Sequence, residues 1–117
     1  IKNIPTQADA VFLLPDSLIS TRLSDLIKAA TELKLPVSGV NVDVVKTHNV
    51  LTSFGSDQIL TGRQAARLAD QIFRGIKPAD LPVESAEYYL AINLKAAKAI
   101  DLDIPDEILR QANIIVR

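Results

Sequence analysis

The 117-residue chain contains no cysteine, so it has no disulfide bonds and no thiolate metal ligands. It has one histidine, His48, and a lone imidazole without cysteine does not make a zinc site of the usual composition. No apolar run approaches the roughly 18 residues that a membrane-spanning helix needs. Thirteen basic residues face fourteen acidic ones, which gives neither the basic footprint of a nucleic-acid-binding protein nor a polybasic membrane patch. We therefore expect no metal, no cofactor and no nucleic-acid partner.

The composition that remains is that of a folded globular domain. Hydrophobic residues make up 48% of the chain and charged residues 23%, which is too apolar for a disordered segment. The length suits one domain of common size, large enough to bury a core. No internal repeat, low-complexity run or long linker divides it, so we predict a single domain.

Short apolar segments alternate with amphipathic ones along the chain. The predicted strands are 10–14, 36–40, 50–54 and 88–92, and the predicted helical segments are 17–33, 42–46, 57–75, 94–100 and 105–112. Asp16 or Ser17 is placed to cap the first helix, and Asp57 to cap the longest one. Gly75, followed by Pro78, is placed to end that long helix. This alternation predicts an α/β fold, a three-layer sandwich with a mostly parallel sheet between helices.

Polar side chains follow three of the predicted strands. Right-handed crossovers place the carboxyl ends of parallel strands along one edge, and open α/β sheets bind ligands outside that edge. The polar residues there are Asp16, Ser17, Asn41 and Asp57, and we predict that they converge on one ligand-binding rim. Each has a purely structural alternative, because aspartate and serine also cap helices and asparagine also satisfies turns.

Several phrases of the sequence, taken in order, resemble the substrate-binding proteins of ABC transporters. They are DAVFLLPD (9–16), LPV (35–37), SFGSD (53–57), TGRQ (61–64), RGIKPADLPVE (74–84), LAINLKAA (90–97) and IPDEIL (104–109). The order and spacing of these phrases carry the resemblance, which runs from about Ala8 to the end of the chain. It points to the branch with a type I periplasmic-binding-protein fold, which includes binders of aromatic amino acids.

This resemblance implies a non-catalytic protein whose two lobes close on a small solute and deliver it to an ABC permease. Residues 1–117 would be the C-terminal lobe, with 57–75 as the crossover helix towards a missing N-terminal lobe. The chain, which begins at Ile1 without a methionine, would then be a fragment of a periplasmic or extracellular, membrane-anchored protein. The resemblance places Asp16, Ser17, Asn41 and Asp57 at ligand-facing positions, and the ammonium group of an amino acid would suit either aspartate.

Two other functions stay open. The same fold can form the extracytoplasmic ligand-sensing domain of a membrane receptor. A small α/β enzyme with Asp16 or Asp57 as a general acid or base is disfavoured, because no nucleophile–base pair or metal cluster stands at a strand end. A lobe without its partner would also expose an apolar stripe on the 57–75 helix. We expect that helix to fold back on its own sheet or to pack against a second copy in a homodimer.

Overall fold

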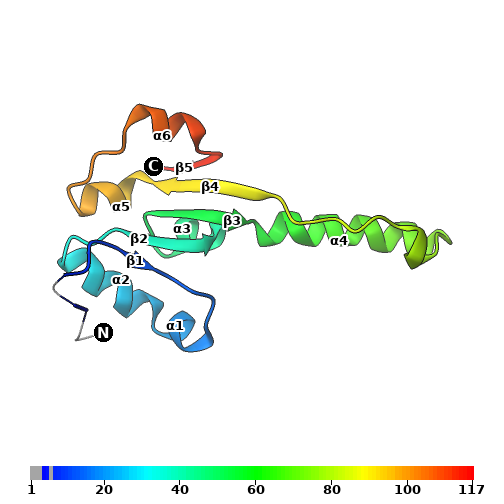
Figure 1. The fold of residues 1–117 in the computed structure, drawn as a ribbon, viewed down its shortest axis with the longest axis horizontal. Helices are drawn as coiled ribbons and strands as arrows, with labels where there is room; N and C mark the ends of the chain where they lie inside the picture. The colour runs from blue at the N-terminus through cyan, green and yellow to red at the C-terminus, as the bar shows by residue number, and fades with distance from the viewer. Residues whose placement is uncertain (1–3, 6) are drawn as a thin grey trace.

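A five-stranded sheet forms the centre of the computed structural model, which describes residues 4–5 and 7–117 (Figure 1). Its strands, in order across the sheet, are β1 (Val11–Phe12), β2 (Val37–Asn41), β3 (Thr52–Ser56), β4 (Tyr88–Asn93) and β5 (Ile114–Val116). β1, β2 and β3 are parallel, β4 is antiparallel to β3, and β5 is parallel to β4. The predicted α/β class with a mostly parallel sheet is confirmed, and β5 is an addition.

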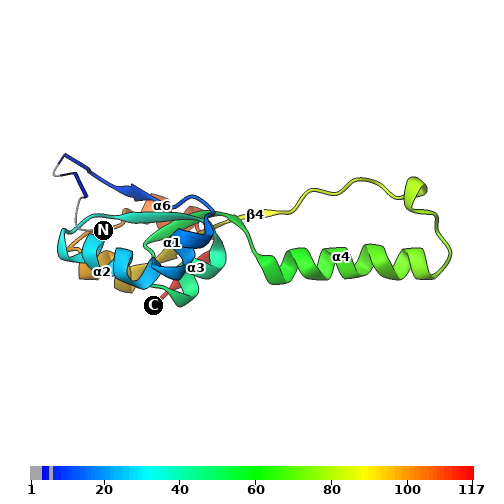
Figure 2. The same ribbon diagram turned by 90° about the horizontal axis from the view of Figure 1, so that it is seen from below.

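Helices occupy the connections between the strands. They are α1 (Ser17–Thr21), α2 (Leu23–Glu32), α3 (Val42–Thr47), α4 (Gln58–Phe73), the 3₁₀ helix η1 (Pro78–Asp80), α5 (Leu94–Ala99) and α6 (Asp106–Gln111). α2, α3 and α5 lie on one side of the sheet, and α6 lies at the edge of the sheet beside β4 and β5 (Figures 1 and 2). The helix predicted over 17–33 is divided at Arg22, whose backbone has φ −116° and ψ 17°.

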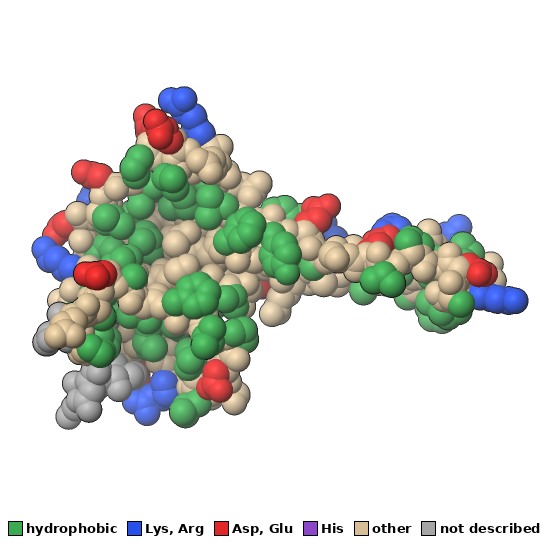
Figure 3. Space-filling view, in the orientation of Figure 1, with side chains coloured by type: hydrophobic (Ala, Val, Ile, Leu, Met, Phe, Trp, Pro, Cys, Tyr) green, Lys and Arg blue, Asp and Glu red, His purple; other side chains and the backbone are tan. Residues whose placement is uncertain are grey.

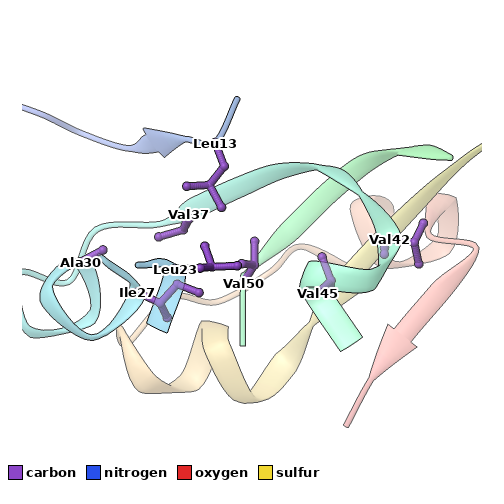
Figure 4. Close-up of a cluster of buried hydrophobic side chains, with 9 residues drawn as sticks. Leu13, Leu23, Ile27, Ala30, Val37, Val42, Val45 and Val50 are labelled. Carbon is purple, nitrogen blue, oxygen red and sulfur yellow. The ribbon is translucent and has the colours of Figure 1, made fainter. Parts of the chain in front are cut away.

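The main core lies between the sheet and the helices α2 and α3 (Figure 4). α2 contributes residues spaced three and four apart, which is the pattern of one helix face. The buried members are Leu13, Leu23, Ile27, Ala30, Val37, Val42, Val45, Val50 and Ala91. Burying one large aliphatic side chain contributes about 1.5–3 kcal/mol relative to leaving it exposed. This core holds α2 and α3 against one face of the sheet.

The other face of the sheet is largely uncovered around β1 and β3. Phe12, Phe54 and Tyr88 lie on this face, and they are 62%, 66% and 65% exposed. The rings of Phe54 and Tyr88 stack with their centroids 5.8 Å apart. Figure 3 shows apolar side chains gathered over this face. We call these three residues the bare sheet face; exposed apolar patches of this kind mark interaction surfaces.

Between β3 and β4 the chain forms a projecting arm, residues 57–87, made of α4 and the segment that returns beside it (Figures 1 and 2). The arm makes the molecule long and narrow, 57 × 34 × 21 Å. The chain leaves and re-enters the sheet at the same edge, so β4 runs antiparallel to β3. The expectation that this helix folds back on its own sheet is wrong, because α4 points away from it. Gly75 ends α4 with a φ of 98°, as predicted.

Within the part of the chain that the structure describes, no helix combines the length and apolar character needed to cross a membrane.

Candidate functional site

The carboxyl ends of β1, β2 and β3 share one edge of the sheet, as their parallel pairing requires. Three helices begin there: Asp16 caps α1, Asn41 caps α3 and Asp57 caps α4. Asn41 pairs in register with Ser56, so Asn41 and Asp57 lie at neighbouring strand ends. We call this edge the carboxyl rim (Figure 1). The rim predicted from the sequence exists, with Ser17 beside Asp16, and ligand contact by these four residues stays a prediction.

Asp57 is the most tightly held residue of the rim, with 5% of its surface exposed. Its Oδ1 accepts hydrogen bonds from the backbone N–H groups of Ile59 (2.9 Å) and Leu60 (3.2 Å). Its Oδ2 accepts from Lys46 Nζ of α3 at 2.9 Å. These donors, Lys46 first, hold the pKa of Asp57 below its ordinary value. Both carboxylate oxygens are therefore committed to positioning α4 against α3.

The other rim residues are more open. Asp16 is exposed, and its Oδ1 accepts from the N–H groups of Leu18 (2.8 Å) and Ile19 (3.1 Å). Asn41 is half-buried, and its Oδ1 accepts from the N–H of Val44 at 3.2 Å. Caps of this kind contribute about 1 kcal/mol each. The capping role that the sequence allowed for Asp16 is confirmed, and Asn41 caps a helix rather than satisfying a simple turn.

A second feature, which sequence reasoning missed, is a hollow of about 330 Å³ between α4 and the returning segment. Leu60, Thr61, Gln64 and Arg67 line it from α4, and Glu84, Glu87 and Tyr89 line it from the other side. We call it the arm cavity. Its lining residues lie about twenty positions apart in the sequence, and only the return of the arm brings them together. No local motif signals this arrangement.

One wall of the arm cavity is an ion-pair network centred on Glu84. Arg67 donates to both oxygens of Glu84, and Gln64 Nε2 donates to Oε2 at 2.8 Å and to the carbonyl of Ser85 at 3.2 Å. Arg67 first, and then Gln64, hold the pKa of Glu84 below its ordinary value. This network ties the returning segment to α4.

The opposite wall contains Glu87 and Tyr89. The Tyr89 hydroxyl donates to Glu87 Oε2 at 2.5 Å. This hydrogen bond raises the pKa of Tyr89, and so do its partial burial and the negative charges of Glu87 and Asp57. The charged residues that line the cavity are Arg67, Glu84 and Glu87. Because Arg67 neutralises Glu84, the carboxylate of Glu87 leaves the lining with one net negative charge.

No cluster of three or more histidine, cysteine, aspartate or glutamate residues suited to a metal ion occurs across the described residues.

The bond between Asp57 and Lys46 predicts a pH-dependent difference between the wild type and Asp57→Asn. Because the pKa of Asp57 is lower in the folded than in the unfolded protein, its stabilising contribution is complete above the unfolded pKa of about 3.9 and disappears as the pH falls through the folded value. We expect the variant to unfold at lower urea concentration than the wild type at neutral pH, and this gap to shrink as the pH is lowered towards 3. A gap of constant size, measured by urea unfolding at both pH values, would contradict this assignment.

The sheet, its helices and the rim at the carboxyl edge are those of one lobe of a type I periplasmic-binding-protein fold. A family model described as ABC transporter substrate binding protein matches residues 1–116, and the chain belongs to this family. The resemblance seen in the sequence is thereby confirmed. No curated protein sequence matches the chain.

Three solved structures with a similar fold come from different bacteria. A conserved domain protein from Vibrio cholerae O1 biovar El Tor is 29% identical with a TM-score of 0.76, and the match covers 94% of this chain and 37% of that one. An ABC domain in complex with L-Trp from Streptococcus pneumoniae is 25% identical with a TM-score of 0.76, and the match covers 95% of this chain and 38% of that one. A ligand-free, open substrate-binding protein with adhesive properties from Clostridium difficile shares the fold. It is 22% identical with a TM-score of 0.69, and the match covers 94% of this chain and 37% of that one. The present chain spans little more than a third of each.

Proposed function

We propose that this chain is the C-terminal lobe of an extracytoplasmic solute-binding protein that serves an ABC importer. The lobe would hold one side of a small solute, with an amino acid as the first candidate, in a cleft between two lobes. Family membership supports the solute-binding role, and the L-Trp in a neighbour of 25% identity supports the amino-acid hypothesis. The protein would act as a non-catalytic, membrane-anchored component in the periplasm or outside the cell, with the ABC permease as its partner.

The arm carries this proposal. None of the sixteen residues of α4, all of which the structure describes, is buried, and an isolated helix of that length is marginal in water. Ile59, Phe73 and Val83 on the arm are 63%, 88% and 100% exposed. Burying each such side chain would contribute about 1.5–3 kcal/mol. An N-terminal lobe of the same protein would supply the missing contact, because the matched structures extend well beyond the part shared with this chain.

The position of the arm explains why the cleft would form at the rim. α4 starts at Asp57, so a lobe that packs along the arm also faces Asp16, Ser17 and Asn41. A solute between the lobes would complete hydrogen bonds that neither lobe makes alone, and its higher affinity for the closed state would drive closure. Asp57 would act in support, by fixing the direction of α4.

Solute binding by the full-length protein tests the proposal. We expect calorimetric titration against a panel of amino acids, sugars and carboxylates to give one tight ligand. The C-terminal lobe alone should bind that ligand at least about a hundredfold more weakly, because half of the polar contacts are absent. No binding by the full-length protein, or equal affinity in the isolated lobe, would refute the two-lobe site.

A rim variant locates the solute within the full-length protein. Asp16→Ser retains a capping side chain but removes the charge, and we expect it to lower affinity about tenfold. Asp25→Ser removes an exposed charge of α2 that pairs with Arg22, and it should leave affinity unchanged. If the two variants bind the solute with equal affinity, the solute does not contact the end of the first strand.

Solute uptake by cells that carry the permease separates transport from the receptor alternative, which predicts binding without uptake.

A further inference from the structure

The arm cavity has one carboxylate with bonding capacity to spare. Glu84 accepts two hydrogen bonds from Arg67 and one from Gln64, which occupies both of its oxygens. Glu87 accepts from Tyr89 through Oε2, and its Oε1 accepts no hydrogen bond from the described part of the chain. A carboxylate oxygen that lines a cavity and lacks a donor suits a cationic ligand group.

Glu87 also lies where a solute on the carboxyl rim would reach it. Tyr88 pairs with Ser56 across β3 and β4, so Glu87 and Asp57 flank neighbouring positions at the same edge of the sheet. Asp57 itself is 5% exposed and bonded through both oxygens, which leaves it little capacity for a ligand. Of these two carboxylates, Glu87 is therefore the one available to a solute.

The rest of the lining suits a small amine rather than a bare inorganic ion. Leu60 and the ring of Tyr89 provide apolar contact, while Thr61 and Gln64 add polar groups. The volume of about 330 Å³ lies at the lower end of the range for small-molecule sites. The Tyr89 hydroxyl holds the Glu87 carboxylate from one side and so orients it. The excess negative charge disfavours an anionic group in this position.

From this geometry we infer that the arm cavity binds a primary ammonium group of the solute, and that Glu87 is the residue that anchors it. This inference rests on the proposed function and places the ammonium subsite at the base of the arm. It differs from the sequence-based expectation, which assigned the ammonium to Asp16 or Asp57. Tyr89 acts as a positioning residue for Glu87.

The test uses the full-length protein and the variant Glu87→Gln, which keeps the shape of the side chain and an oxygen that can accept from Tyr89. The probes are the standard L-amino acids, a matched set in which each amino group is replaced by hydrogen, and simple sugars. We expect Glu87→Gln to weaken binding of the amine ligand by about tenfold or more, and to reduce its preference over the amine-free analogue by a similar factor. Glu107→Gln, an exposed charge change on α6, should alter neither quantity.

Each outcome of the titrations decides a different claim. An amine ligand that binds the wild type and Glu87→Gln equally would overturn the ammonium subsite and leave the solute-binding function intact. If the wild type binds only a solute without an amino group, the ammonium subsite is also refuted and the solute-binding function is retained. A wild type that binds none of the probes would count against the proposed function and against this inference with it. Thermal unfolding of both variants confirms that each is folded during the titrations.

Discussion

Gly55→Ala is expected to lower the free energy of unfolding by about 3 kcal/mol, at the upper end of the usual cost of overpacking. A Cβ atom on Gly55 would lie 1.8 Å from the carbonyl oxygen of Val40 and 2.6 Å from its carbonyl carbon. Both atoms belong to the backbone of β2, so no side-chain rotation relieves the overlap. The new methyl group would have to push β2 away from β3 in the middle of the sheet.

The close approach at Gly55 has a structural cause. Gly39 pairs with Ser53 and Asn41 pairs with Ser56. Between these two pairs β3 advances by three residues while β2 advances by two, so β3 contains one extra residue. This irregularity, of the β-bulge kind, presses the backbone of β3 against Val40, and glycine is the residue that permits such contact. The same irregularity sets the relative positions of Asn41 and Asp57. Loss of the local geometry would therefore also disturb the carboxyl rim.

Urea unfolding measures this effect, and Gly62→Ala provides the matched control. Gly62 lies in α4, and a Cβ atom added to it would meet no neighbouring atom within 4 Å. Alanine there should stabilise the protein by about 0.5–1 kcal/mol, because glycine weakens a helix interior. Opposite signs for the two substitutions are the expected result. An unfolding midpoint for Gly55→Ala at or above that of the wild type would contradict the observed β2–β3 contact.

The order of strands and helices could be predicted because its signals are local. Apolar runs such as 36–40 and the three-to-four spacing in α2 report directly on which residues are buried. β5 was missed because Ile114–Val116 is three residues long, and its pairing with β4 defines it as a strand. The break between α1 and α2 was missed because the apolar periodicity continues through Arg22.

The direction of α4 could not be predicted in the same way. A helix that covers its own sheet and one that projects towards another part of a protein carry the same amphipathic pattern. The apolar stripe expected on the 57–75 helix contains Leu68, Ala69 and Ile72, and the structure buries none of these three residues within this chain. The pattern identified a surface in need of a partner, while the partner depends on contacts outside the segment.

The parts of the candidate site that could be predicted are again those formed by contacts between residues close in sequence. Asp16 and Asp57 were recognised as caps because a capping bond spans two or three residues. The arm cavity depends on bonds such as Gln64 to Glu84, which joins residues twenty positions apart. Those contacts exist because the arm returns along α4, and no composition or spacing rule encodes that return.

Asn93→Ala is expected to lower the free energy of unfolding by about 2–4 kcal/mol, the sum of a lost cap and an orphaned buried carbonyl. Asn93 is 3% exposed, and its Oδ1 caps α5 by accepting from the N–H groups of Lys95 (2.9 Å) and Ala96 (3.1 Å). Its Nδ2 donates to the carbonyl of Val45 at 3.1 Å and to Asn49 Oδ1 at 3.3 Å. One side chain thus joins the end of β4, the start of α5 and the end of α3.

A second asparagine cap separates the two contributions to this loss. Asn41→Ala removes the Oδ1 bond to the N–H of Val44 on a half-buried residue, and it should cost about 1 kcal/mol in the same urea titration. The additional loss in Asn93→Ala then measures the bond to Val45, because replacing Asn93 leaves that carbonyl buried without its donor. Equal losses for the two variants would show that the hydrogen bond from Asn93 to the carbonyl of Val45 adds nothing to the stability.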